Sequence, residues 1–329
     1  MKKQCYHMRL TMEGNTLNPE SMIKKKLPIW YHDLYTNGID VKARFPRDRY
    51  EKLLTRLKKS ESWNNIEIKS PRNITRNEIL MAHSIDYVDR FLAGKLEIKE
   101  EKRIGLTPWT AKMIERTQRL MGGAIEATEY AMKNGGITGN MAGGTHHAHR
   151  DFGSGYCVFN DLAVCAIHAI DNLGLDRVAI LDLDVHQGDG TATILQDRND
   201  ILTISVHCST NFPFRKSLSD HDIPVEPNTS DNGYLKQVNR ALELCLEFEP
   251  DLVLYQAGVD GLETDSLGKL SLSRNGMKRR NQMVFASIFE AKRIPIVVFM
   301  GGGYSKPIDH TIDAFEDLFT QAAQFNQRQ

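Results

Sequence analysis

LDLDVHQGDG, the stretch from Leu181 to Gly190, overlaps the end of an apolar run that begins at Val178. The run predicts a buried strand, because it is short, apolar and rich in branched residues. Its end carries several side chains that can bind metals or move protons: Asp182, Asp184, His186 and Asp189. Burying such carboxylates without partners would cost roughly several kcal/mol. The stretch therefore predicts a metal or catalytic site at a strand end, where open α/β sheets bind their ligands.

Strand-like and helical patterns alternate on both sides of this stretch. The strand-like runs are Val178–Leu183, Ile201–Val206, Leu252–Ala257 and Ile296–Met300. The helical runs are Leu162–Leu173, Tyr234–Phe248 and Gly276–Lys292. Such alternation predicts βαβ units and an α/β fold with a mainly parallel sheet. Polar or glycine-rich clusters follow all four strand-like runs, so we expect them to meet at one edge of the sheet.

The first half of the chain is predicted to be mainly helical. Helical spacing follows Pro46, and Thr75 and Glu78 have the spacing of a capping box. A long helix from Met113 should end at the sequence Asn134-Gly135-Gly136. We expect residues 1–26 to be an irregular lead-in and residues 27–329 to form the domain.

Composition excludes several classes of protein. The 329 residues hold 42 Lys+Arg and 42 Asp+Glu, and this balance argues against general nucleic-acid binding. No apolar run approaches the roughly 20 residues of a membrane span, and residues 1–26 contain no apolar signal core. The five cysteines form no CxxC pair, which argues against a disulfide framework or a zinc finger. We expect a cytoplasmic protein that binds neither nucleic acid nor membrane.

Asp184, His186 and Asp260 form a candidate metal site. Asp184 and His186 are two residues apart, so in an extended chain they would point the same way. Asp260 follows the third strand-like run. One imidazole and two carboxylates leave a coordination position open, as catalytic Zn²⁺ requires, and carboxylate-rich ligation also suits other divalent ions.

Two further motifs can carry chemistry. AGGTHHAH, from Ala142 to His149, places His146 and His147 in a glycine-containing loop, where a histidine pair can supply a base and an electrostatic partner. The three glycines before Tyr304 let the backbone approach a ligand, and the Tyr304 hydroxyl could donate a hydrogen bond there. Taken alone, each motif is also compatible with an ordinary loop.

Together, these motifs resemble the zinc-dependent histone deacetylase family and its arginase/deacetylase fold. The matching segments are GGTHHA, SGYCVFND, DLDVHQGDG, AGVDGLETDSLGKLSLS and GGGY. The resemblance runs from about Pro28 to the C-terminal helix, and the forms HQGDG and DxLGxLSLS look most like class IV and bacterial histone-deacetylase-like amidohydrolases. It implies a single three-layer domain with a central, mostly parallel sheet between helices.

The resemblance also implies roles for individual residues. Asp184, His186 and Asp260 become the metal ligands. His147 becomes the general base and His146 its electrostatic partner. The remaining roles are an oxyanion donor (Tyr304), carboxylates behind the two histidines (Asp182 for His146, Asp189 for His147), substrate-tunnel residues (Tyr156, Phe212, Gly155, Leu267) and a structural K⁺ site (Asp182, Ser205, and backbone carbonyls of Asp184, His186 and Val206).

Three positions depart from the family pattern. Tyr156 stands where many relatives have Phe, and Leu267 stands where the polyamine-specific relative has a gatekeeper Glu. The stretch from Glu100 to Trp109 offers no counterpart of the loop Asp that anchors peptide substrates in many relatives. All three departures concern parts of the protein that would contact the substrate, so they bear on which substrate is selected.

The resulting prediction is a metal-dependent deacetylase with one Zn²⁺ per chain, or Fe²⁺ in the same site. It would hydrolyse the amide of an acylated amine, such as N-acetyl-lysine in a protein, to amine and carboxylate. Acetylpolyamines, other small acylated amines and long-chain acyl groups remain alternatives. A two-manganese arginase-type site is rejected, because Gly188 and Leu262 stand where it needs carboxylates. A binding module that has lost catalysis would not retain the complete set of ligands, histidines and Tyr304.

Overall fold

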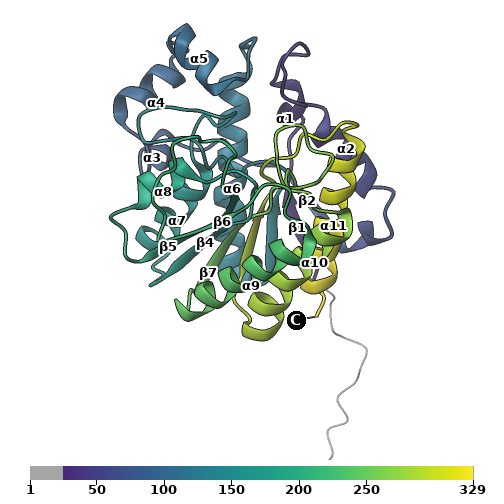
Figure 1. The fold of residues 1–329 in the computed structure, drawn as a ribbon. Coiled ribbons are helices and arrows are strands. Elements are labelled where there is room, and N and C mark those ends of the chain that lie inside the picture. The colour runs from purple at the N-terminus through teal and green to yellow at the C-terminus, as the bar shows by residue number, and fades with distance from the viewer. Residues whose placement is uncertain (1–24, 329) are drawn as a thin grey trace, which may run out of the picture.

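The computed structural model describes residues 25–328, and its centre is one eight-stranded sheet in which every strand pair is parallel (Figure 1). The strand order is β2-β1-β3-β8-β7-β4-β5-β6. The strands are β1 (Leu27–Trp30), β2 (Ile66–Lys69), β3 (Ile137–Asn140), β4 (Val178–Asp182), β5 (Ile201–Cys208), β6 (His221–Val225), β7 (Leu252–Gln256) and β8 (Ile296–Phe299).

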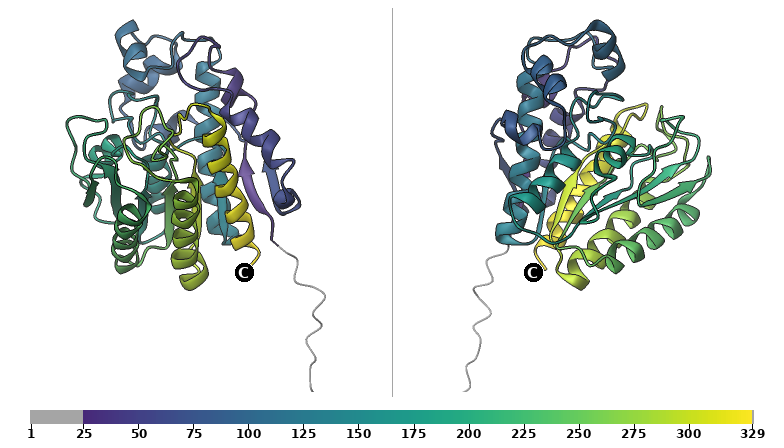
Figure 2. Two further views of the ribbon diagram at one scale, coloured as in Figure 1. Left: turned by 45° about the vertical axis from the view of Figure 1, so that its right-hand side comes forward. Right: turned by 90° about the vertical axis from the view of Figure 1, so that its left-hand side faces the viewer.

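Helices cover both faces of the sheet, as the edge-on view in Figure 2 shows. One layer contains α6 (Met113–Asn134) and α7 (Asp161–Asp171), and the other contains α9 (Asp231–Glu247), α10 (Arg274–Val284) and α11 (Asp309–Asn326). The shorter helices are α1 (Leu34–Asn37), α2 (Arg49–Leu57), α3 (Arg76–Ile79), α4 (Ile85–Leu92), α5 (Ile98–Ile104) and α8 (Asp189–Leu195), with a 3-10 turn at Glu61–Asn65. The predicted three-layer α/β fold is therefore confirmed.

The four predicted strands are β4, β5, β7 and β8, and they lie side by side in the middle of the sheet. Every residue of these strands is buried. Parallel strands with helices on both faces read as continuous apolar runs, which is why the sequence revealed them. The sequence pattern did not reveal β1, β2, β3 and β6, which have only four or five residues each and include Pro28, Gly139 and Pro224.

The helix predictions hold with local differences. Helix α6 ends at Asn134, as the glycines after it predicted. The capping box is formed, because the Thr75 side chain accepts a hydrogen bond from the Glu78 N–H and the Glu78 side chain accepts one from the Thr75 N–H. It opens only the single turn of α3. The helical run predicted over Gly276–Lys292 divides into α10 and a π-helical segment, Phe285–Glu290.

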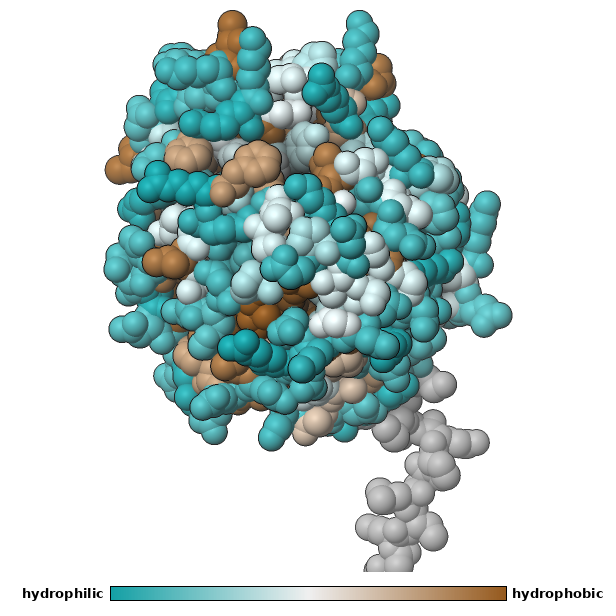
Figure 3. Space-filling view, viewed as in Figure 1, coloured by the Kyte–Doolittle hydropathy of each residue, from teal (hydrophilic) through white to brown (hydrophobic). Residues whose placement is uncertain are grey.

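The remaining expectations concern membrane spans, the cysteines and the lead-in at the start of the chain. In the part of the chain that the structure describes, no helix combines the length and apolarity needed to cross a membrane. The face seen in Figure 3 is mainly hydrophilic, with small, separate hydrophobic groups. Cys157, Cys165, Cys208 and Cys245 are free thiols. The expected lead-in, apart from residues 25 and 26, lies outside the described residues.

Candidate active site

The site forms where four neighbouring parallel strands end. Each of β3, β8, β7 and β4 is followed by a loop, and these loops carry the histidine pair, Tyr304, Asp260 and the Asp184/His186 pair respectively. Because parallel strands all end at the same edge, residues separated by more than a hundred positions meet there. The loops after β4, β7 and β8 are among those that the sequence pattern predicted to meet, whereas the loop after β3 follows a strand that the sequence did not reveal.

Asp184, His186 and Asp260 meet as a buried cluster whose ligand atoms all lie within 4.8 Å of one another. His186 Nδ1 is 3.1 Å from Asp184 Oδ1 and 3.1 Å from Asp260 Oδ2. The expectation that strand alternation aligns Asp184 and His186 was wrong, because β4 ends at Asp182. The two side chains converge through the bend of the loop after the strand.

The electrostatics of this cluster fit a divalent cation. Burial and then the charge of Asp184 raise the pKa of Asp260 to about 7. Burial lowers the pKa of His186, but its hydrogen bonds to Asp184 and Asp260 outweigh that effect and raise the pKa to about 10. A single proton on His186 Nδ1 must then serve two buried carboxylates. A dication between the three ligand atoms would neutralise both carboxylates at once.

Gly302 explains why glycines precede Tyr304. The Gly302 N–H donates a hydrogen bond to Asp184 Oδ2 at 2.7 Å. A Cβ atom at position 302 would lie 1.8 Å from Asp260 Oδ2, which is far inside contact distance. Only glycine lets this backbone approach both carboxylates, so the motif shapes the candidate metal site as well as leading to Tyr304.

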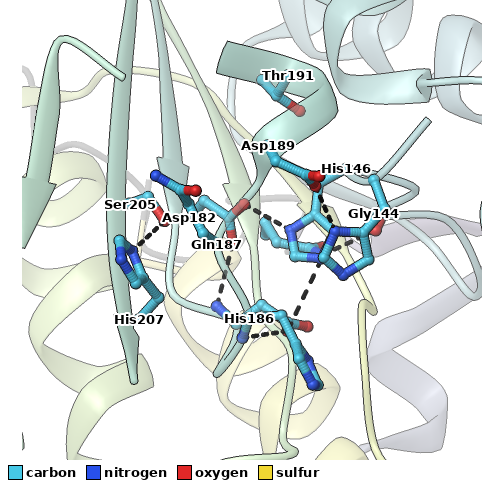
Figure 4. A network of polar contacts seen from close by, with 12 residues as sticks. Gly144, His146, Asp182, His186, Gln187, Asp189, Thr191, Ser205 and His207 are labelled. Carbon is cyan, nitrogen blue, oxygen red and sulfur yellow. Dashed lines mark hydrogen bonds and ion pairs between the residues drawn. The ribbon is translucent and has the colours of Figure 1, made fainter. Parts of the chain in front are cut away.

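The tandem histidines lie side by side, and each has its own carboxylate; Figure 4 labels His146, Asp182 and Asp189. His146 Nδ1 is 2.7 Å from Asp182 Oδ2, and His147 Nδ1 is 2.6 Å from Asp189 Oδ1. The two Nε2 atoms are 3.1 Å apart, so they can share one proton. Asp189 is the first residue of α8.

Their surroundings push the two imidazoles toward opposite charge states. Burial lowers the pKa of His146, but the charges of Asp182 and Asp184 raise it to about 9. Burial also lowers the pKa of His147, the charge of His146 adds to this effect, and Asp189 does not offset it, so the pKa falls to about 4. At neutral pH, His146 is therefore charged and His147 is neutral.

A cavity of about 570 Å³ leads to this cluster. Its lining includes all four residues expected in the substrate tunnel, together with His146, His147, Tyr304 and the three candidate ligands. The Phe212 ring meets His147 edge-on, with ring centres 4.9 Å apart. Tyr156 lies 5.7 Å from the Tyr304 ring. Burial raises the pKa of Tyr304 well above 10, so its phenol keeps its proton.

Gly155 permits the close packing of the tunnel wall on His147. It has a φ of +54°, and a Cβ there would lie 2.6 Å from the His147 ring. Tyr156, the next residue, also has a positive φ of 68°. Its backbone N–H donates to the Ile104 carbonyl at 2.7 Å, which ties this wall to the end of α5.

The residues expected around a K⁺ ion surround the end of β4. Asp182 and Ser205 are register partners on adjacent strands. Asp182 Oδ1 accepts a hydrogen bond from the Asp184 N–H at 3.1 Å, and the Ser205 hydroxyl lies 2.9 Å from His207 Nδ1 (Figure 4). Ser205, Val206 and the residues after Asp182 are buried together. The monovalent cation itself stays a prediction.

Sequence analysis missed three buried arginines beside the site. Arg49 donates to the Gly301 and Gly303 carbonyls at 3.0 and 3.2 Å. Arg280 donates to the Ala257 carbonyl at 3.1 Å, just before Asp260. Arg116 lines the inner part of the cavity. The available signal was an arginine on the buried face of a helix, where Arg49 precedes Tyr50, Leu53 and Leu57.

His149 was also missed as a site residue. Its Nε2 is 3.1 Å from Asp189 Oδ2, so Asp189 contacts two imidazoles. Its Nδ1 is 2.8 Å from the Thr193 hydroxyl, which in turn donates to the Gly190 carbonyl at 3.1 Å. The ring stacks on Phe152 with centres 4.5 Å apart. Its position in the same short motif as His146 was the only sequence signal.

Comparisons with known proteins agree with this geometry. The family model described as "Histone deacetylase domain" matches residues 43–319. An uncharacterized protein of Picosynechococcus sp. (strain PCC 7002) is 39% identical over 298 residues, which cover 90% of this chain and 98% of that protein. Histone deacetylase 2 of Arabidopsis thaliana is 30% identical over 300 residues, covering 88% and 77% of the two chains. Acetoin utilization protein AcuC of Bacillus subtilis is 32% identical over 240 residues, covering 67% and 62%.

Two solved structures share the fold. The HDA15 HD domain aligns with a TM-score of 0.75 at 20% identity, covering 90% of each chain. Acetylpolyamine aminohydrolase from Burkholderia pseudomallei aligns with a TM-score of 0.73 at 18% identity, covering 89% of this chain and 98% of that chain. The family match spans every strand of the sheet except β1 and all the loops that build the site. This chain belongs to the histone deacetylase family of hydrolases.

Proposed function

We propose that this protein is a zinc-dependent deacetylase that hydrolyses the amide of an acylated amine, such as N-acetyl-lysine in a protein. The observation that carries the proposal is that Asp184, His186 and Asp260 open into the same cavity as the paired histidines and Tyr304. Acetylpolyamines, other small acylated amines and longer acyl groups are alternative substrates for the same site.

Asp184, His186 and Asp260 would hold the Zn²⁺, one ion per chain, and Fe²⁺ suits the same donors. A bound ion would polarise the acyl carbonyl and lower the pKa of a water molecule. Asp182, Ser205 and the neighbouring carbonyls would hold K⁺. We place residues 27–329 in the catalytic domain and the protein in the cytoplasm.

His147 is the proposed general base. Asp189 accepts from its Nδ1, so the neutral ring presents the Nε2 lone pair toward the site. His147 takes a proton from the attacking water. His146, kept charged by Asp182, supplies positive charge beside the developing oxyanion and helps to deliver a proton to the leaving amine.

Tyr304 and the tunnel walls complete the proposed site. The Tyr304 phenol, which keeps its proton, donates to the oxyanion as it forms. Tyr156 and Phe212 pack along the alkyl chain of the acylated amine, and Gly155 and Leu267 complete the entrance. The products are a free amine and a carboxylate.

The test compares turnover on an acetyl-lysine peptide, an acetylpolyamine and a long-chain acyl-lysine peptide, using metal-loaded protein. We expect amine and carboxylate in equal amounts, with the highest kcat/KM for acetyl-lysine. Asp260→Asn is the matched negative control, because it keeps the shape but removes a ligand charge. The absence of hydrolysis of all three substrates by metal-loaded protein would overturn the proposal.

A further inference from the structure

Two cations line the entrance of the cavity. Arg103 comes from the last turn of α5, and Lys269 comes from the loop that leads from β7 to α10. Both side chains are exposed.

Contacts with neighbouring segments of the chain hold both cations in place. Arg103 Nε donates to the Gly153 carbonyl at 3.2 Å, and its guanidinium lies 4.3 Å from the centre of the Phe152 ring. Lys269 Nζ donates to the Thr210 carbonyl at 2.9 Å. The Lys269 backbone N–H donates to Asn211 Oδ1 at 3.1 Å, directly beside the tunnel residue Phe212. These charges are therefore part of the entrance.

In the part of the chain that the structure describes, no carboxylate of the cavity lining is paired with these two cations. Within residues 25–328, the carboxylates of the cavity lining are Asp184 and Asp260, both buried and both assigned to the metal. Glu100, three residues before Arg103 on α5, is paired with Arg90 at 2.6 Å, and the charge of Arg103 also helps to lower its pKa. Leu267 adds no charge at the entrance. A negatively charged group of a substrate at the entrance would therefore lie near Arg103 and Lys269 without competition from a carboxylate of the lining.

We propose that the entrance selects acylated amines that carry a carboxylate beside the acylated group, through Arg103 and Lys269. This inference rests on the proposed function of the same site. With the acyl group at the metal, the lysine side chain spans the tunnel and leaves the Cα and its neighbours at the entrance. The carboxylate can come from Asp or Glu beside an acyl-lysine in a protein, or from the α-carboxylate of a free acyl-lysine.

The same charges disfavour amines that remain polycationic after acylation, such as acetylpolyamines. Exposed charge pairs change affinity by roughly two- to fivefold each. Two cations acting together should therefore produce about tenfold discrimination at low salt, and salt should weaken it. Such like-charge repulsion is a common source of specificity.

The experiment uses metal-loaded protein and three peptides with one central acetyl-lysine, flanked by two Asp, two Ala or two Lys. We expect kcat/KM to fall in that order, with about a tenfold range. Arg103→Gln combined with Lys269→Gln should bring the Asp:Lys ratio close to one. Arg103→Lys should retain most of the ratio. Lys236→Gln, an exposed change on α9, is the matched control and should leave the ratio unchanged.

Two further arms identify the source of the carboxylate. A preference for free acetyl-lysine over its carboxamide supports a small-molecule source, and a preference for the Asp-flanked peptide supports a protein source. A wild-type enzyme that treats all flanks equally, or prefers Lys flanks, overturns the inference, as does an unchanged ratio in the double variant. Hydrolysis of the Ala-flanked peptide separately tests the proposed function. Calorimetric binding of the three peptides gives the selectivity even without turnover.

Discussion

Tyr304 is the side chain whose proposed chemistry depends on a single atom, its hydroxyl oxygen. We expect Tyr304→Phe to lower kcat by roughly 10²–10³, the usual effect of removing one oxyanion donor. Its ring packs among Phe45 and Tyr156, so the phenylalanine should keep the fold and metal content. Steady-state kinetics with metal analysis checks this, and Tyr156→Phe is the matched control. Near-normal turnover of Tyr304→Phe would leave Tyr304 with a packing role only.

His146 and His147 should differ in their importance. The neutral His147 is the proposed base, so His147→Ala should remove nearly all turnover while metal binding is retained. His146→Ala should leave more activity, because it removes a charge beside the base but leaves the base itself. Initial rates and metal content of the two variants provide the comparison. Greater damage from His146→Ala would reverse the assigned roles.

His149 acts on His147 through the second oxygen of Asp189. Because the Thr193 hydroxyl donates to the Gly190 carbonyl, His149 must donate from Nδ1, and Nε2 also faces an acceptor in Asp189. Partners of this kind commonly contribute roughly ten- to a hundredfold to activity. We expect His149→Ala to lower kcat by about tenfold with little change in KM. Thr193→Val, which leaves the Asp189 contact in place, should have a smaller effect. Equal kcat values for His149→Ala and wild type would exclude this role.

At the scale of elements, loops position the residues of the site, and buried side chains hold those loops in place. His83, which follows α3, is such a side chain. Its Nε2 accepts from the backbone N–H of Asn160, the N-cap of α7, at 2.9 Å. Its Nδ1 lies 3.0 Å from the His149 carbonyl, so the neutral ring with a proton on Nδ1 satisfies both partners. A second proton would place two donors face to face at Asn160.

This arrangement predicts a pH dependence of stability. Burial lowers the pKa of His83 from 6.5 to about 4. Between these values the unfolded chain binds a proton that the folded protein does not, so stability is full above pH 6.5 and falls as the pH drops toward 4. By pH 5, His83 should account for a loss of about 2 kcal/mol. Burial similarly lowers the pKa of His207, so only part of the total acid sensitivity belongs to His83.

The measurement compares the free energy of unfolding of wild type and His83→Gln at about pH 7.5 and pH 5. The variant should be less stable at the higher pH but should lose about 2 kcal/mol less on acidification. His310→Gln, at an exposed position at the start of α11, is the control and should behave like the wild type. Equal losses in wild type and His83→Gln would contradict the prediction.

At the scale of the whole molecule, metal binding should stabilise the fold. The candidate ligands follow β4 and β7, so an ion joins two loops at the centre of the sheet. Ligand at a hundred times its Kd stabilises a protein by about 2.7 kcal/mol. We expect Zn²⁺ to raise Tm, with one ion bound per chain, and Asp260→Ala to remove both effects. Two equivalent ions, or unchanged metal content in Asp260→Ala, would contradict the ligand assignment.

The sequence by itself determined the architecture and the chemistry of the candidate site. The central strands are continuous apolar runs, and polar side chains stand directly after them, so both the parallel sheet and its active edge follow from local pattern. Asp184, His186 and Asp260 belong to short motifs next to those strands, whereas the histidine pair was found by its own motif after β3, a strand that the sequence did not reveal. Such signals can be recognised in a sequence because the apolarity and the length of a run are local properties.

Only the tertiary structure decided which distant side chains support the site and which charges lie at its entrance. Arg49 donates to the Gly301 carbonyl 252 positions away, and its place on the buried face of α2 does not by itself indicate that partner. Arg103 and Lys269 line the same cavity although they belong to separate segments. Even Asp184 and His186 converge through a bend beyond β4. Contacts of this kind depend on how elements pack and loops bend, and neither residue spacing nor hydrophobic periodicity encodes that geometry.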